Sequence, residues 1–115
     1  MKIDKDVEQK IKRLQLYEQN MQALASQKQQ FQNQLVEIES ALAELETAEV
    51  SYKIIANIMV KSEKPALKAE LEQKKEMLEL HIKTLDKQES SIRDKSKQIQ
   101  QEVLGTIKNE EDKPK

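Results

Sequence analysis

A short apolar segment lies near the middle of this chain, between two long stretches with heptad spacing. Residues 50–61 are rich in β-branched and aromatic side chains, which strands favour, and Pro65 follows soon after them. The segment therefore predicts two short strands around a tight turn, joining two long helical arms. Because a two-stranded hairpin alone is only marginally stable in water, we expect it to pair with other chains.

The stretch before this segment has the a and d pattern of a coiled coil over about five heptads, interrupted only by Lys10 and Lys28. Asp6, with Glu8 and Gln9 after it, fits a helix N-cap, so we expect a helix from about residue 6 to about residue 47. The seam positions are Val7, Leu14, Met21, Lys28, Leu35 and Leu42 in one register, and Ile3, Lys10, Tyr17, Leu24, Phe31, Ile38 and Leu45 in the other.

The stretch after the segment repeats the pattern more sparsely. Pro65 suits the first turn of a helix and disfavours helical backbone at Lys64, so we expect this helix to begin near Pro65 and to fray past Ile107. Residues 109–115 contain no apolar side chain, which predicts a disordered tail. The seam positions are Leu71, Leu78, Leu85, Ile92 and Ile99 in one register, and Ile82 and Val103, diluted by Lys75, Glu89 and Ser96, in the other.

The two arms can fold back on each other about the bend. In an antiparallel pairing, facing seam residues have numbers that add up to about 113, as for Leu35 with Leu78 and Leu14 with Ile99, and most facing pairs are apolar. We therefore expect a mainly α protein with four parts: an N-terminal coiled-coil helix at 1–49, a β-hairpin at 50–61, a C-terminal coiled-coil helix at 62–108 and a tail at 109–115. A two-helix arm has no concave pocket of its own.

Composition excludes several classes of function. The net charge is −1, and Arg13 and Arg93 are the only arginines, so nucleic acid is a poor partner. The chain has no cysteine, and its lone His81 has no histidine or cysteine at ligand spacing, so we expect no metal, no cofactor and no catalytic site. No apolar run is long enough for a membrane span and residues 1–6 do not resemble a signal peptide, so we expect a cytoplasmic protein.

Residues 50–61, together with the run 71–89, resemble the β-class subunit of prefoldin in its archaeal-type form. The first arm matches that family mainly in pattern. One position departs from the family, which usually has glycine at the hairpin turn where this chain has Ala56. Because alanine resists positive φ, we expect Asn57 to take the left-handed conformation, or the turn to have a different geometry.

The resemblance implies an ATP-independent holdase without cofactors. It implies a hexamer of two α-class and four β-class subunits, whose hairpins form a β-barrel body from which six coiled-coil arms extend. Non-native proteins would be held between the arm tips and passed to a group II chaperonin. The residues expected to assemble the body are Val50, Tyr52, Ile54, Ile55, Ile58, Met59 and Val60.

Apolar residues also gather near both chain ends, which an antiparallel arm brings to the same end. Several of them are not needed by the seam, and exposed apolar side chains of this kind can hold unfolded clients. The expected client-binding residues are Met1, Ile3, Val7, Ile11, Leu16, Val103, Leu104 and Ile107.

Two other functions fit a helical hairpin. A structural coiled-coil adaptor or tether without client binding would not need the apolar residues of the 50–61 segment. An RNA-binding helical arm would carry a basic stripe, which the net charge of −1 disfavours. The chaperone subunit is therefore the favoured interpretation.

Overall fold

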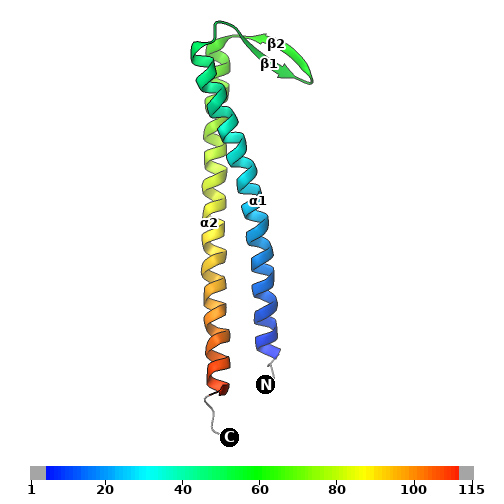
Figure 1. Ribbon diagram of the computed structural model, residues 1–115, viewed down its shortest axis with the longest axis vertical. Coiled ribbons are helices and arrows are strands. Elements are labelled where there is room, and N and C mark those ends of the chain that lie inside the picture. Colours follow the sequence, from blue (N-terminus) through cyan, green and yellow to red (C-terminus); the bar gives the residue numbers. More distant parts are fainter. Residues whose placement is uncertain (1–4, 112–115) are drawn as a thin grey trace. The chain divides into compact units, whose positions relative to one another are not determined.

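The computed structural model describes the backbone of residues 5–111 and the side chains of residues 5–108. Its four elements follow one another as α1 (Lys5–Thr47), β1 (Ser51–Ile55), β2 (Ile58–Ser62) and α2 (Lys64–Glu111), as Figure 1 shows. This order confirms the predicted fold of two long helices joined by a short antiparallel β-hairpin.

The chain divides into two compact units. The terminal unit consists of Met1–Gln27 and Leu85–Lys115, and the hairpin unit is Lys28–Thr84. Each unit contains one segment of α1 and one of α2 running in opposite directions (Figure 1). Within each unit, ion pairs join the two helices close to the predicted antiparallel register: Lys10 with Glu102 in the terminal unit, and Glu39 with Lys75 in the hairpin unit.

The core of the terminal unit is a small cluster of aliphatic side chains. Val7, Ile99 and Val103 are buried there. They come from the predicted seam positions of the two helices, which confirms the antiparallel interpretation for this unit. The partly buried residues packed against the cluster are Ile11, Leu14, Tyr17 and Ile107.

In the hairpin unit the seam buries Leu45 and Leu78. Phe31 stacks on His81, with ring centroids 5.3 Å apart and ring planes 16° apart. Such an offset stack lets an aromatic ring at a seam position extend the contact onto a surface histidine of the facing helix. His81 is thus a helix-surface residue that packs on the arm.

The helix ends differ from the predicted ones at three points. α1 begins at Lys5, so Asp6 lies in the first helical turn rather than at the N-cap, where its carboxylate still favours the helix dipole. α2 begins at Lys64, one residue before Pro65, although proline disfavours helical backbone at the residue before it. The Leu67 N–H donates to the Glu63 carbonyl at 2.9 Å and closes this first turn. The helix continues to Glu111, so the backbone of residues 109–111 is helical where a tail was predicted, and residues 112–115 lie outside the described part.

The turn of the hairpin corrects the expectation for Ala56. The register pairs Ile55 with Ile58 and leaves Ala56 and Asn57 as the two loop residues, with φ of 48° and 69°. Two positive φ values in a two-residue loop are those of a type I′ turn, whose twist matches that of the flanking strands. Ala56 therefore does adopt the left-handed conformation, at a cost of about 1–2 kcal/mol for a residue with a Cβ atom.

This strain makes position 56 a sensitive test of the turn. We expect Ala56→Asn to stabilise the hairpin by several tenths of a kcal/mol to about 1 kcal/mol, because asparagine tolerates positive φ, and Ala56→Val to destabilise it by more than about 1 kcal/mol. Hydrogen exchange of the Ile55 and Ile58 amides measures both effects. Equal protection in the two variants would contradict a type I′ turn.

Candidate interaction surfaces

The hairpin carries apolar side chains on both of its faces. Side chains alternate along a strand and directly paired residues share a face. The register therefore assigns the described strand residues to two sets. One face carries Ser51, Lys53, Ile55, Ile58, Val60 and Ser62, and the other carries Tyr52, Ile54, Met59 and Lys61.

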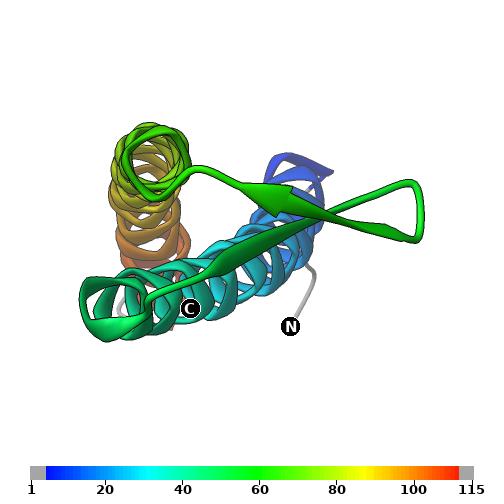
Figure 2. The same ribbon diagram turned by 90° about the horizontal axis from the view of Figure 1, so that it is seen from above.

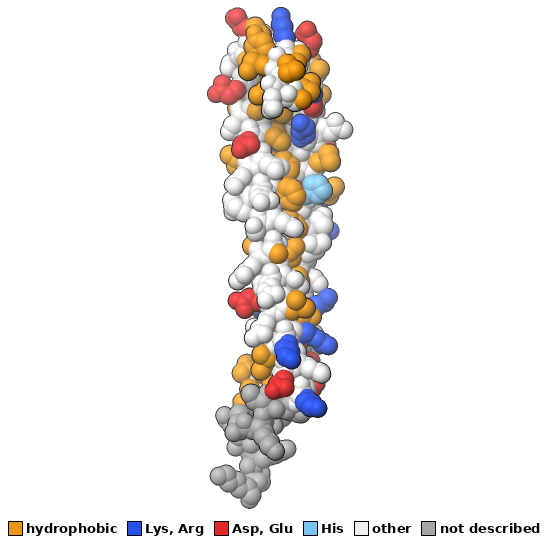
Figure 3. Space-filling model, turned by 90° about the vertical axis from the view of Figure 1, so that its right-hand side faces the viewer, with side chains coloured by type: hydrophobic (Ala, Val, Ile, Leu, Met, Phe, Trp, Pro, Cys, Tyr) orange, Lys and Arg blue, Asp and Glu red, His pale blue; other side chains and the backbone are white. Residues whose placement is uncertain are grey.

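All seven residues expected to assemble the subunits are exposed in this single chain. Ile54, Ile58 and Met59 have the largest exposed fractions, 69%, 65% and 66%. Figure 3 shows hydrophobic side chains gathered over the hairpin on the face in view, and Figure 2 shows the two strands as a narrow twisted ribbon. A two-stranded sheet also leaves the outer edge of each strand without backbone partners. The hairpin thus offers two apolar faces and two open edges.

An ion pair ties the hairpin to α2. Lys53 Nζ on β1 lies 2.8 Å from Glu70 Oε2, and Lys74 Nζ lies 3.7 Å from the other oxygen of the same carboxylate. The base of the hairpin is closed by the Ser51 hydroxyl, which donates to the Ser62 carbonyl at 2.7 Å. These contacts fix the strands against the first turns of α2 within the hairpin unit.

A second contact joins the two helices beside the hairpin. Lys64 Nζ donates to the Glu46 carbonyl at 2.8 Å, in the last turn of α1. A cation at the C-terminal end of a helix satisfies a carbonyl that has no partner within the helix. The end of α1, which precedes β1, and the start of α2, which follows β2, are therefore joined by a hydrogen bond.

The electrostatics of Glu70 follow from this anchor. The hydrogen bond from Lys53 lowers the pKa of Glu70 below its ordinary value, Lys53 and Lys74 add favourable charge, and partial desolvation acts in the opposite direction. Because the folded pKa is the lower one, the contribution of Glu70 to stability is complete above the ordinary glutamate pKa. It is lost as the pH falls through the folded value.

The structure separates the six described residues expected at the arm tip into three groups. Val7 and Val103 are buried in the core cluster, so their side chains lie inside the arm, and Ile11 and Ile107 are partly covered by it. Leu16 and Leu104 are exposed, at 53% and 66%. Met1 and Ile3 lie outside the described residues. Of the residues expected to bind clients, Leu16 and Leu104 are thus the described ones whose side chains are exposed.

Lys10, which interrupts the seam in the terminal unit, is held by carboxylates. Its Nζ lies 3.1 Å from Asp6 Oδ2 on the same helix and 3.4 Å from Glu102 Oε2 on the facing helix. The hydrogen bond with Asp6 is the main cause of a raised pKa for Lys10, and Glu102 adds to it. The cation is therefore accommodated in the seam by a bridge between the two helices.

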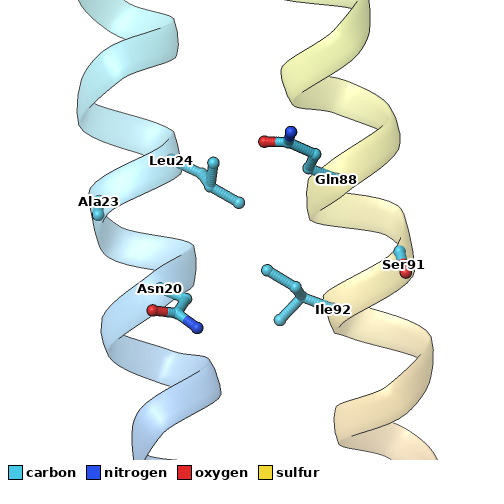
Figure 4. A pocket seen from close by; sticks show the side chains of 6 residues that line it. All are labelled: Asn20, Ala23, Leu24, Gln88, Ser91 and Ile92. Carbon is cyan, nitrogen blue, oxygen red and sulfur yellow. The ribbon is translucent and has the colours of Figure 1, made fainter.

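The described surface has shallow depressions between the helices. One, of about 330 Å³, lies in the terminal unit and is lined by residues of both helices (Figure 4). Among the described residues, no group of three or more His, Cys, Asp or Glu side chains is arranged to hold a metal ion. Within the same part of the chain, no helix is both long enough and apolar enough to span a membrane.

Comparison with known proteins decides the family. A family model described as "Prefoldin subunit" matches residues 8–110 of the chain. The chain belongs to the prefoldin family. Prefoldin subunits are components of a chaperone, and the membership means that this chain assembles with other prefoldin subunits.

The relatives also give the class of subunit. The prefoldin subunit beta of Thermococcus onnurineus is 34% identical over 109 residues, covering 92% of this chain and 94% of the relative. That of Pyrobaculum neutrophilum is 38% identical over 86 residues, covering 72% of this chain and 68% of the relative. The crystal structure of the prefoldin beta subunit from Thermococcus strain KS-1 superposes with a TM-score of 0.86 at 31% identity, covering 91% and 95% of the two chains. The chain is a prefoldin subunit of the archaeal β class.

The sequence did not predict some of the contacts in this prefoldin subunit. The Lys53–Glu70 anchor joins residues 17 positions apart on different elements, and spacing alone gives no signal for it. The Lys10–Glu102 ion pair is only weakly indicated by the sequence. In the antiparallel register Lys10 faces Val103, and Glu102 is the residue next to Val103. Val36, exposed at 61% on α1, has no counterpart in the predicted surfaces, and nothing in the structure explains its exposure.

The anchor gives a prediction for the protonation of Glu70. In Lys53→Met the pKa of Glu70 should rise toward its ordinary value, because the largest cause of the lowered pKa is removed. Lys74→Met is the matched control and should raise it less, since its contact is longer. Titration of the Glu70 carboxyl carbon by NMR measures both shifts, and an equal or larger rise in Lys74→Met would show that Lys53 does not hold the carboxylate.

Proposed function

We propose that this chain is a holdase subunit that captures non-native proteins with the ends of its coiled-coil arms. The observation that carries the proposal is the exposure of Leu16 and Leu104 in the terminal unit. The core cluster of that unit is built from Val7, Ile99 and Val103 and closes without them. Large aliphatic side chains that the fold does not use are available to the apolar segments of an unfolded client.

The proposed assembly contains two α-class subunits and four copies of this chain. The hairpin supplies the interface: its exposed apolar faces pack into a shared β-barrel body, and its open strand edges pair with neighbouring strands. The proposed oligomerisation residues are those exposed on the hairpin and just before it, Val50, Tyr52, Ile54, Ile55, Ile58, Met59 and Val60.

The proposed activity is the binding and release of non-native proteins without nucleotide, in the cytoplasm. A client held by the arms would be handed to a group II chaperonin, as the family resemblance implies. The single glycine of the chain, Gly105, leaves no glycine-rich loop of the kind that cradles phosphates. The proposed client binding therefore does not depend on a nucleotide site.

The energetics require several arms to act together. Burial of one leucine side chain contributes about 1.5–3 kcal/mol, which is far below a useful affinity. Arms of one assembly that grip the same client raise the effective concentration of each further contact. Weak individual contacts also suit a chaperone that has to accept clients of unrelated sequence and to release them.

We expect Leu16→Ser with Leu104→Ser to weaken suppression of client aggregation by about tenfold, since the loss of apolar contact exceeds about 1.4 kcal/mol. The mass of the assembly should stay unchanged, because neither side chain lies in the hairpin. Light scattering of a denatured client during refolding, with parent and variant assemblies at equal concentration, measures the effect.

Val36→Ser is the matched control, because it also replaces an exposed aliphatic side chain on α1 but lies in the hairpin unit. It should keep the activity of the parent assembly. Full activity in the double variant, or an equal loss in Val36→Ser, would contradict client capture by the arm ends.

A further inference from the structure

The chain connects the hairpin to the helices at its base only. Residues 48–50 join α1 to β1, and Glu63 alone joins β2 to α2. From residue 54 to residue 61 every position of the hairpin is exposed, and Figure 2 shows the two strands projecting away from the helix ends. Apolar packing against the helices therefore does not set the angle at which the outer part of the hairpin stands.

A side-chain contact between the hairpin and α2 lies away from that base. The base is the Ser51–Ser62 pair, and Lys53 is two residues further along β1, about 7 Å out at the ordinary rise of a strand. Lys53 Nζ donates to Glu70 Oε2 on α2 at 2.8 Å. Two connections at the base leave the hairpin free to turn about them, and a contact away from the base stops that rotation. The Lys53–Glu70 ion pair is thus placed to set the angle between the hairpin and α2.

Glu70 has a second cation within reach. Lys74 Nζ lies 3.7 Å from Glu70 Oε1, the oxygen that Lys53 does not use. A glutamate four residues before a lysine is the favourable order for such a pair on a helix. Lys74 is the more exposed of the two lysines, with 58% of its side chain accessible against 38% for Lys53. The carboxylate therefore keeps a partner on its own helix when Lys53 leaves, which lowers the cost of breaking the contact with the hairpin.

We propose that the Lys53–Glu70 ion pair is a releasable latch between the hairpin and α2. In the latched state, which the structure shows, Glu70 binds both lysines and the hairpin stands at one angle. In the released state Glu70 keeps Lys74 alone, and the hairpin turns about its base. Because the proposed assembly is held together by the hairpins, the latch also sets the direction of α2 in the assembly, and this consequence rests on the proposed function.

The latch is tested by a distance within the hairpin unit. The chain has no cysteine, so Lys61→Cys on β2 and Lys83→Cys on α2 give two defined sites for spin labels, both at exposed positions. Pulsed electron paramagnetic resonance measures the distance between the labels in the complete assembly, with labelled chain diluted into unlabelled chain. Lys53→Met should increase the population away from the main distance about two- to fivefold, the range that an ion pair of this exposure can control.

Lys74→Met is the matched control, and its effect should have the opposite sign. It also removes one lysine from the carboxylate, but this lysine is the partner of the released state. The displaced population should therefore fall below that of the parent. An equal increase in the two variants, or no increase in Lys53→Met, would overturn the latch.

An exchange of charges separates attraction from a merely structural role. Glu70→Lys places a third cation beside Lys53 and Lys74 and should release the hairpin. Lys53→Glu combined with Glu70→Lys restores an attractive pair and should return the labels to the main distance. A double variant that is displaced as much as Glu70→Lys alone would contradict the proposal.

The latch and the proposed assembly can fail separately. The same pair of labels, measured in the full chain without an α-class subunit, reports the latch whether or not the assembly forms. If Lys53→Met shifts the distance there and the mass of the assembly does not depend on the hairpin, the latch stands and the proposed assembly is wrong. If the mass depends on the hairpin and Lys53→Met gives the distances of the parent, the latch alone fails.

Discussion

Two helices that pack on each other bury side chains along one seam only, and the rest of this structure follows from that limit. Among the described residues, no large side chain is fully buried, and even Val7, the most covered of the core residues, keeps 4% of its surface exposed. A core this thin cannot enclose a ligand, which agrees with the shallow depressions between the helices. Stability has to come from many seam contacts in series and from partners outside the chain.

The same limit explains the character of the hairpin. The bend between the two helices has no third element that would cover it, so the apolar side chains on both faces of β1 and β2 stay exposed and the outer strand edges stay unpaired. In a monomeric protein such a surface would be an aggregation hazard. We propose that other prefoldin subunits cover this surface in the assembly; the Lys53–Glu70 ion pair ties the hairpin to α2.

Sequence spacing was sufficient for the regular part of the fold. The heptad positions predicted the helices and the seam, and the β-branched segment at 50–61 predicted the hairpin. Residue spacing did not predict the conformation of the turn, which depends on how the two strands pair. The pairing of Ile55 with Ile58 leaves two loop residues and so forces Ala56 to a positive φ against its local preference. At the arm end the sequence indicated two roles for Val7 and Val103, because their seam positions indicated burial and their place near the chain ends indicated client binding. The packing places both in the core.

We propose that the exposed hairpin holds the assembly together, and native mass spectrometry with an α-class prefoldin subunit tests this most directly. Ile54→Asp with Ile58→Asp puts a charge on each face of the hairpin and should give only smaller species, while circular dichroism shows helices as in the parent chain. Leu104→Asp, a charge placed in the terminal unit, should leave the full mass unchanged. An unchanged particle mass in the hairpin variant would contradict the account.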